Sequence, residues 1–583
     1  MVKEKFNLLG LDGSLSEGKV KSWRFCKKGD SKQDFKKPPF YIFSVILFLI
    51  LVIFLGRLFS LTIISGEENR SLAENNRVKL VEVEAKRGQI LDRDGQMLAQ
   101  SQRLYFLTKG SKVSQISESQ VKDMEAKGLA SENFEGELGR ISQEIERNYS
   151  LSEITAHILG YVSGVQEEDL GQNPSISSSV PIGRLGVEAS YDDFLRGKNG
   201  KKLIEVDASG KKVSILGEEN SQDGRSINLT IDTSLQKVAF EALKKQADKI
   251  GSGRAALIAQ NPKTGEVLAL VSLPSFDPKN VGKFMADEKK PLFNRVDQGT
   301  YPPGSIFKIV SALAGLESGK ITKDTEIEDV GEFFLGNTKF TNWFYRSYGG
   351  KDGVLKIDRA IARSNDIFFY KLAQTVGLDP IREMALKLGF GNKTGIDLPS
   401  ESSGLVPDDV WKRSTYGESW YPGDTMHLGI GQGFMLATPI QISSLTSYVA
   451  SAKLTRPYLV SKIGGQEGSA GSTSKVESIE METKTLGENL VKIANLKLVR
   501  EGMRQACQEK GTGWPFFNAP YKVGCKTGTA EKELGDPHAW FTVFAPYDDP
   551  QLALTVIIED GGEGSSVAGP VAREILDWWF KNK

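Results

Sequence analysis

Residues 301–308 read Tyr-Pro-Pro-Gly-Ser-Ile-Phe-Lys, and a largely apolar run continues from them to Leu316. Two prolines and a glycine stop any regular element before them, because proline fixes φ and glycine permits a sharp turn. The run that follows is apolar on nearly every side, so as a helix it must be buried. The stretch therefore predicts a core helix that begins at a sharp turn near Ser305.

Lys308 is the only charged residue between positions 306 and 316. Burial lowers the pKa of a lysine, because the charged form loses its hydration, and this favours its use as a base. Ser305 lies one helical turn earlier on the same face, at a helix N-terminus that favours negative charge. A hydroxyl beside a buried amine is the arrangement that activates serine for acyl transfer. The alternative is an ordinary helix cap with a lysine that reaches solvent.

Composition excludes several classes of protein. A chain of 583 residues allows two or three domains. Its 74 basic and 74 acidic residues give no basic stripe, so we expect no nucleic-acid partner. Three cysteines and three histidines, without a Cys/His cluster, indicate neither a disulfide framework nor a structural zinc site.

Residues 39–64 are almost wholly apolar, and the segment before them, 1–38, is polar and basic. This length spans a bilayer, and the positive flank predicts a cytoplasmic N-terminus. A cleaved signal peptide is the alternative, but its apolar core would be shorter and would precede a cleavage site of small residues. We therefore expect a cytoplasmic tail (1–38), a transmembrane helix (39–64), and everything after residue 65 outside the cytoplasm.

Residues 65–224 show no catalytic constellation by spacing, so a packing and spacer domain is expected there. Alternation predicts a strand at 81–85, and a strand with a hairpin turn follows at 87–95. The polar stretch 112–150 has a mostly helical pattern, and 157–162 is typical of a short strand.

Residues 225–583 have strands at both ends and helices between, which predicts an α+β domain with one sheet covered by helices. Segment 464–474 is a flexible loop by composition. The strands are expected at 227–232, 255–260, 266–271, 539–545 and 551–559, and helices at 355–376 and 568–579, the first ended by Gly377.

Acyl transfer also needs a proton relay, an oxyanion hole and groups that hold the substrate. Ser364 and Asp366 place a hydroxyl and a carboxylate two residues apart, before an apolar stretch. Lys-Thr-Gly at 526–528 follows a strand, where the glycine lets a substrate strand approach the sheet edge and Lys and Thr can hold a carboxylate. Two other copies, at 263–265 and 393–395, lie in a predicted turn and a loop.

The ordered motifs Ser305–Lys308, Ser364–Asp366 and Lys526–Gly528 resemble those of penicillin-binding proteins and serine β-lactamases. The stretches 92–95 and 195–197 resemble the pedestal of class B penicillin-binding proteins. The resemblance implies a transpeptidase domain (225–583), with an antiparallel sheet covered by helices, on an elongated pedestal domain (65–224). Ser-Asn-Asp followed by an aromatic pair and Tyr resembles the elongation type, whereas division-type enzymes usually show Ser-x-Asn.

The resemblance implies roles for the first two motifs. Ser305 would be acylated by a D-alanyl-D-alanine stem peptide, and the acyl group would pass to an amine of a neighbouring strand. Lys308 would take the proton from Ser305, Ser364 would pass protons toward the leaving amine, and Asp366 would orient the lysines. β-Lactams would trap the acyl-enzyme.

The third motif would bind the substrate. Lys526 and Thr527 would hold the terminal carboxylate, beside Gly528, and the N–H groups of Ser305 and Thr529 would form the oxyanion hole. No cofactor is implied. Some relatives carry zinc near the second motif, but 306–363 contains no His or Cys, so no metal is expected.

Two features depart from the resemblance. The stretch 102–148 is shorter than the usual head subdomain, which leaves any partner contact through it open. Cys525 stands where glycine is usual, with Cys507 upstream. An oxidising compartment would permit a disulfide, but two separate buried thiols are the commoner case and the expectation.

The resemblance also implies a bacterial cell membrane location, and as partner a glycosyltransferase of the multi-spanning shape–elongation–division family. The alternatives are a division-type enzyme, a β-lactam sensor or β-lactamase, and a catalytically silent scaffold. A sensor would need a signalling domain, and 1–38 is too short for one. A scaffold would not need a buried lysine.

Overall fold

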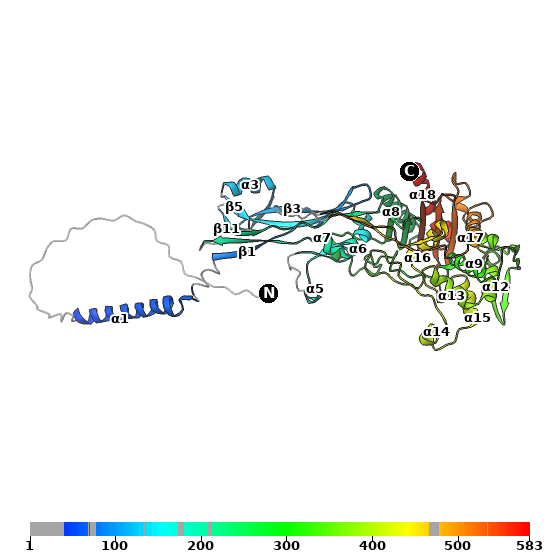
Figure 1. Cartoon of the computed structure of the whole chain (residues 1–583), viewed down its shortest axis with the longest axis horizontal. Helices are drawn as coiled ribbons and strands as arrows, with labels where there is room; N and C mark the ends of the chain where they lie inside the picture. Colours follow the sequence, from blue (N-terminus) through cyan, green and yellow to red (C-terminus); the bar gives the residue numbers. More distant parts are fainter. Residues whose placement is uncertain are drawn as a thin grey trace, which may run out of the picture. The chain divides into compact units, whose positions relative to one another are not determined.

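The structure, a computed structural model, describes residues 40–67, 69, 77–127, 129–132, 135–136, 138–172, 180–207, 212–465, 477–532 and 535–583. It divides into two compact units, one ending at Asn76 and one running from Arg77 to Lys583 (Figure 1). The predicted tail (1–38) and most of the predicted loop (464–474) lie outside the described residues.

The N-terminal unit holds a long apolar helix. It consists of α1 (Phe40–Phe59) and a π-helical continuation, η1 (Ser60–Ile64). Together they span 25 residues, and their most apolar 18-residue window has a mean hydropathy of 2.8 and is not buried against protein. At 1.5 Å per residue this exceeds the roughly 30 Å of a bilayer core. Among the described residues it is the one helix long and apolar enough to cross a membrane.

Two sheets build the first part of the second unit. A three-stranded antiparallel sheet has the order β1-β10-β11. A nine-stranded sheet has the order β21-β20-β12-β2-β3-β7-β5, with β4 beside β3 and β6 beside β7. It joins strands from both predicted domains, so the pedestal and the following domain share a framework. The strands are β1 (Val78–Val83), β2 (Ile90–Leu91), β3 (Met97–Lys109), β4 (Lys112–Ile116), β5 (Ala130–Glu132), β6 (Glu135–Gly136), β7 (Gly139–Tyr149), β10 (Gly200–Val206), β11 (Lys212–Glu219), β12 (Ile227–Leu229), β20 (Val460–Ile463) and β21 (Ile479–Glu480).

Short elements connect these strands. They are α3 (Glu118–Ala126), η2 (Ser152–Ile154), α4 (Ala156–Leu159), α5 (Glu167–Gln172), α6 (Gly186–Ser190), α7 (Asp192–Leu195) and the hairpin β8 (Val162–Ser163) with β9 (Ile182–Gly183).

Two predictions for this region were wrong. The described residues between 112 and 150 hold one short helix, and β4 and β7 pair with β3 instead. The charged residues of β7 favour a helix individually, but Gly139, Ile141, Arg147 and Tyr149 are buried at alternate positions, and pairing over ten residues overrides that preference. The strand predicted at 157–162 begins as the buried helical turn α4.

The sheet of the predicted transpeptidase domain is five-stranded and antiparallel, in the order β14-β13-β25-β24-β23. Helices α8 and α18 pack on one face and α16 on the other. Ala255, Leu257 and Ala259 belong to the core under α8 and α18, and Ala256 and Ile258 to the core on the opposite face. The expected α+β fold is confirmed. The elements are β13 (Ala255–Gln260), β14 (Val267–Leu273), β23 (Gly524–Ala530), β24 (His538–Ala545), β25 (Leu552–Ile558), α8 (Thr233–Lys249), α16 (Pro439–Ser451) and α18 (Gly564–Asn582).

A helical layer lies beside α16, and α9 is its centre. Helix α9 packs against α12, α13 and α17 (Figure 1). Its residues up to Leu316 are buried, as predicted. The elements are η3 (Val281–Lys283), η4 (Gly304–Ile306), α9 (Lys308–Glu317), α10 (Trp343–Tyr348), α11 (Ile357–Arg363), α12 (Asp366–Val376), α13 (Leu378–Lys387), α14 (Asp409–Tyr416), α15 (Pro422–Gly429), α17 (Ile493–Ala506) and η5 (Trp514–Phe516). Three two-stranded ribbons accompany them: β15 (Ile327–Asp329) with β18 (Gly353–Leu355), β16 (Glu332–Leu335) with β17 (Thr338–Thr341), and β19 (Lys453–Thr455) with β22 (Thr485–Glu488).

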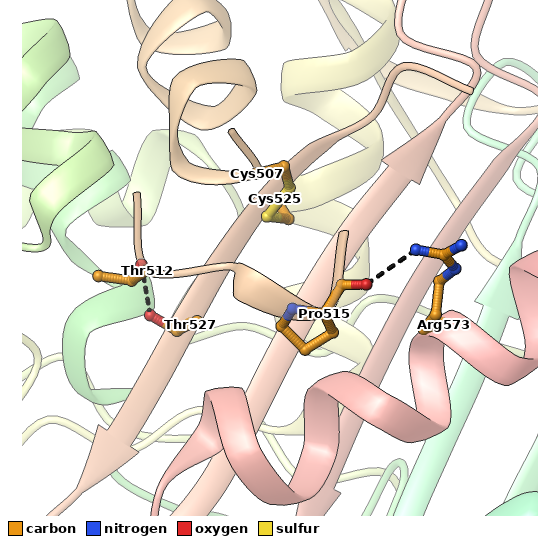
Figure 2. Close-up of a disulfide and its surroundings, with 6 residues drawn as sticks. All are labelled: Cys507, Thr512, Pro515, Cys525, Thr527 and Arg573. Carbon is orange, nitrogen blue, oxygen red and sulfur yellow. Dashed lines mark hydrogen bonds between the residues drawn. A yellow bond between two sulfur atoms is a disulfide. The ribbon is translucent and has the colours of Figure 1, made fainter. Parts of the chain in front are cut away.

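Cys507 and Cys525 form a disulfide, so the expectation of two separate thiols was wrong (Figure 2). Helix α17 packs against β23, which brings the two Cα atoms to 5.9 Å, a separation that a disulfide spans. The bond joins the C-terminal end of α17 to the strand that carries Lys526.

Candidate active site

Ser305 lies in the 3₁₀ turn η4, immediately before α9, and lines a cleft of about 1120 Å³. Gly304 has a φ of +54°, and a Cβ there would lie 2.8 Å from the carbonyl oxygen of Thr529. The Gly304 amide donates to the Gly431 carbonyl at 2.9 Å. Because only glycine fits this left-handed and crowded position, the Pro-Pro-Gly entry fixes Ser305 against β23. Ser364, Asp366, Thr527 and Thr529 line the same cleft.

Lys308 is fully buried beneath Ser305's turn. Its Nζ donates to the Ser364 carbonyl oxygen at 2.7 Å and to Asp366 Oδ1 at 2.6 Å. Burial lowers the pKa of Lys308, and the neighbouring Asp366 carboxylate only partly restores it. The side chain is therefore an amine kept from water and held at two points.

The Ser364 hydroxyl lies between two buried lysines. Lys526 Nζ donates to Ser364 Oγ at 2.8 Å, and Lys308 Nζ lies 3.5 Å from the same oxygen. Ser364 has a φ of +51°, in the left-handed region where a serine is strained, and such strain gathers at functional sites. It forms the break between α11 and α12, so the prediction of a single helix at 355–376 is wrong at this point.

The pKa of Lys526 is lowered well below its usual range. Burial is the main cause, and the positive charge of Lys308 adds to it. Both lysines are fully buried, and the charge of Lys308 favours the neutral form of Lys526. The pair can therefore give and take protons through Ser364.

Asp366 is the first residue of α12 and contacts one of the two lysines. Its Oδ1 accepts from Lys308, and its Oδ2 accepts from the backbone N–H of Trp343 at 2.8 Å. Lys526 is held instead by Ser364 and by the Thr527 carbonyl at 2.9 Å. The two lysines thus have separate anchors.

A buried polar layer supports this motif, and sequence reasoning missed it. Asn365 Nδ2 donates to Asp329 Oδ2 at 2.8 Å and to Asp352 Oδ2 at 3.0 Å. Asn342 Nδ2 also donates to Asp329 Oδ2 at 2.8 Å, while its Oδ1 accepts from the Asp366 amide at 3.1 Å. These residues come from separate ribbons and loops, so no spacing in the chain announces them.

Lys526, Thr527 and Gly528 lie on β23, the edge strand of the five-stranded sheet. A Cβ at Gly528 would lie 2.9 Å from Cβ of Trp540, 3.1 Å from Cγ1 of Ile306 and 3.2 Å from the Pro303 carbonyl oxygen. The glycine therefore lets β23 approach η4. An edge strand beside a cleft can pair with an extended peptide. The copies at 263–265 and 393–395 lie in the β13–β14 turn and in a loop.

Comparison with known proteins identifies the family. The model for the penicillin-binding protein transpeptidase domain matches residues 255–577, and that for the penicillin-binding protein dimerisation domain matches 108–229. The chain belongs to the penicillin-binding proteins. Peptidoglycan D,D-transpeptidase MrdA of Haemophilus influenzae is 30% identical to this penicillin-binding protein over 96% of the chain and 94% of its own length.

Two solved structures extend the comparison. One is PBP2 of Pseudomonas aeruginosa in complex with WCK 5153, with a TM-score of 0.67 and 32% identity, covering 87% of this chain and 97% of that one. The other is PBP2 of Helicobacter pylori in complex with MreC, with a TM-score of 0.70 and 26% identity, covering 86% and 99%. Both matches reach well beyond the transpeptidase domain.

Proposed function

We propose that this penicillin-binding protein is an elongation-type peptidoglycan D,D-transpeptidase that β-lactams inhibit. The observation that carries the proposal is the Ser364 hydroxyl between Nζ of Lys308 and Nζ of Lys526, in the cleft that Ser305 lines. The name of the Haemophilus relative supports the activity, and the PBP2 structures support the elongation type.

In the proposed acylation, Ser305 Oγ attacks the carbonyl of the penultimate D-alanine and its proton passes to the neutral amine of Lys308. Lowering of the Lys308 pKa supports this role, because it raises the neutral fraction. Ser364 relays a proton to the amine of the departing D-alanine, which leaves the acyl group as an ester on Ser305. An amine of a second strand then attacks the ester and regenerates the serine hydroxyl.

The substrate is held from the β23 side. The N–H groups of Ser305 and Thr529 are the proposed oxyanion hole, on the facing elements η4 and β23. Thr527 lines the cleft and donates to the terminal carboxylate. Lys526 is fully buried and does not line the cleft, so it acts on that carboxylate through its hydrogen bond to Ser364 Oγ.

We further propose the chain organisation expected from the sequence: a cytoplasmic tail (1–38), a membrane helix (39–64), a pedestal (65–224) and an outward-facing transpeptidase domain (225–583). The apolar helix and the match to the dimerisation domain support it. Elongation-complex proteins and a glycosyltransferase of the shape–elongation–division family are the proposed partners, and the Helicobacter complex with MreC supports such assembly. Loss of co-purification after 39–64 is exchanged for an unrelated anchor would support contact through that helix, and unchanged co-purification would contradict it.

Labelling the full-length protein in detergent with fluorescent penicillin tests the activity. The proposal predicts a durable label that is lost in Ser305→Ala. Rapid release of the label would favour a β-lactamase, and absence of labelling a silent scaffold.

A further inference from the structure

We infer that Thr512 and the Cys507–Cys525 disulfide position the Thr527 hydroxyl to bind the carboxylate of a D-alanyl peptide or a β-lactam. The inference rests on the proposed function and assigns a task to a loop outside the three motifs. Thr512 is a positioning residue, since it acts through Thr527.

The disulfide closes a loop that forms one wall of the cleft. It joins Cys507, at the end of α17, to Cys525, which directly precedes Lys526 on β23. Between the two cysteines, the loop contributes Gly511, Thr512 and Trp514 to the cleft lining. A covalent bond at its base therefore connects a cleft wall to the substrate-binding strand.

The loop lies directly on the disulfide. A Cβ at Gly513 would lie 2.5 Å from the sulfur of Cys525, and the Gly513 amide donates to the Ala506 carbonyl at 2.7 Å. Beyond Gly513, Arg573 Nη1 of α18 donates to the Pro515 carbonyl at 2.8 Å (Figure 2). The segment is therefore fastened on both sides of Gly513, and Thr512 lies next to that anchored glycine.

Thr512 meets the substrate-binding strand through one hydrogen bond. Thr527 Oγ1 donates to Thr512 Oγ1 at 3.0 Å (Figure 2). For Thr527 to donate to a carboxylate oxygen, which accepts only, its hydroxyl rotates and Thr512 donates to Thr527 within the same pair, so the Thr527 proton is left for the ligand. Without the Thr512 hydroxyl, Thr527 Oγ1 loses this hydrogen-bond partner and can rotate away from the carboxylate.

The experiment separates carboxylate binding from general damage. Acylation of the full-length protein in detergent is measured as a second-order rate constant with benzylpenicillin and with its methyl ester, which lacks the carboxylate. Thr512→Val keeps the shape and removes the hydroxyl. Thr338→Val, at an exposed threonine elsewhere in the cleft lining, is the matched control.

Thr512→Val is expected to slow acylation by benzylpenicillin about tenfold, the order expected for one hydrogen bond to a charged group, and acylation by the ester less than about twofold. Thr338→Val should change neither. The double variant Cys507→Ala/Cys525→Ala should lower the acid-to-ester ratio in the same direction.

Four outcomes would overturn the inference. Equal slowing of acid and ester by Thr512→Val would show a structural effect alone. No slowing would show that Thr512 does not position the Thr527 hydroxyl. An unchanged acid-to-ester rate ratio in the double cysteine variant would show that the disulfide does not help to position Thr527. A wild-type protein that penicillin does not acylate at all would instead overturn the proposed function, and the inference with it.

Discussion

Replacing Asp366 with asparagine should destabilise the protein in a way that depends on pH. Asp366 Oδ1 lies 2.6 Å from Lys308 Nζ, with Lys308 fully buried and the Asp366 side chain 13% exposed. Asparagine keeps the size and removes the charge. Lys308 is then a buried ammonium without its counter-ion, next to the second buried amine of Lys526.

The size of the loss follows from the two ways in which Lys308 can respond. Leaving a buried charge unpaired costs about 3–5 kcal/mol. Releasing the proton costs about 1.36 kcal/mol for each unit between the solution pH and the ordinary lysine pKa of about 10.4. Because Lys308 can release its proton, the loss of folding stability is at most about 4 kcal/mol at about pH 7.4 and about 1.4 kcal/mol at about pH 9.4. The unfolded chain then binds the proton and the folded variant does not, so stability of the variant rises with pH.

Urea unfolding of wild type and Asp366→Asn at the two pH values measures this difference. Glu118→Gln, which removes an exposed pair with Lys122, is the control and should change stability at neither pH. An equal loss at both pH values, or no loss at the lower one, would refute the assignment of Lys308 as a buried amine that depends on Asp366.

Three further changes test the packing around the site. Gly528→Ala should lower the free energy of unfolding by about 1–3 kcal/mol and slow penicillin labelling, because the new Cβ would force β23 away from Trp540 and η4. Labelling at the wild-type rate would contradict this. Asn365→Ala should lower the free energy of unfolding in urea by about 3 kcal/mol. It removes the cap of α12 and one hydrogen-bond donor from each of Asp329 and Asp352. A loss below about 1 kcal/mol would show that these hydrogen bonds contribute little to stability. Cys507→Ala/Cys525→Ala should lower the free energy of unfolding by about 3 kcal/mol while the protein still folds, and an unchanged midpoint would show that the bond does not form in the native protein.

The sequence predicts correctly those elements that depend on residues close together in the chain. An apolar run with one lysine predicted the buried helix α9, and Gly377 predicted the end of α12, where its φ is +82°. The predicted strand context of 526–528, which the structure places within β23, distinguished the third motif from the other two copies of Lys-Thr-Gly.

The parts that sequence could not predict depend on long-range pairing. The charged strand β7 is a strand because β3 lies beside it, and its own residues favour a helix. Asp329 and Asp352 meet Asn365 only after β15 and the loop before β18 fold against α12. The disulfide likewise needed the packing of α17 on β23, which no spacing between Cys507 and Cys525 reveals.

The central claim is that Ser305 is the nucleophile, made reactive by an amine kept out of water. Peptide mapping by mass spectrometry after treatment with benzylpenicillin tests it most directly. The account predicts the penicilloyl group on the peptide that contains Ser305, and no adduct in Ser305→Ala. An adduct on another residue, or one that persists in Ser305→Ala, would contradict it.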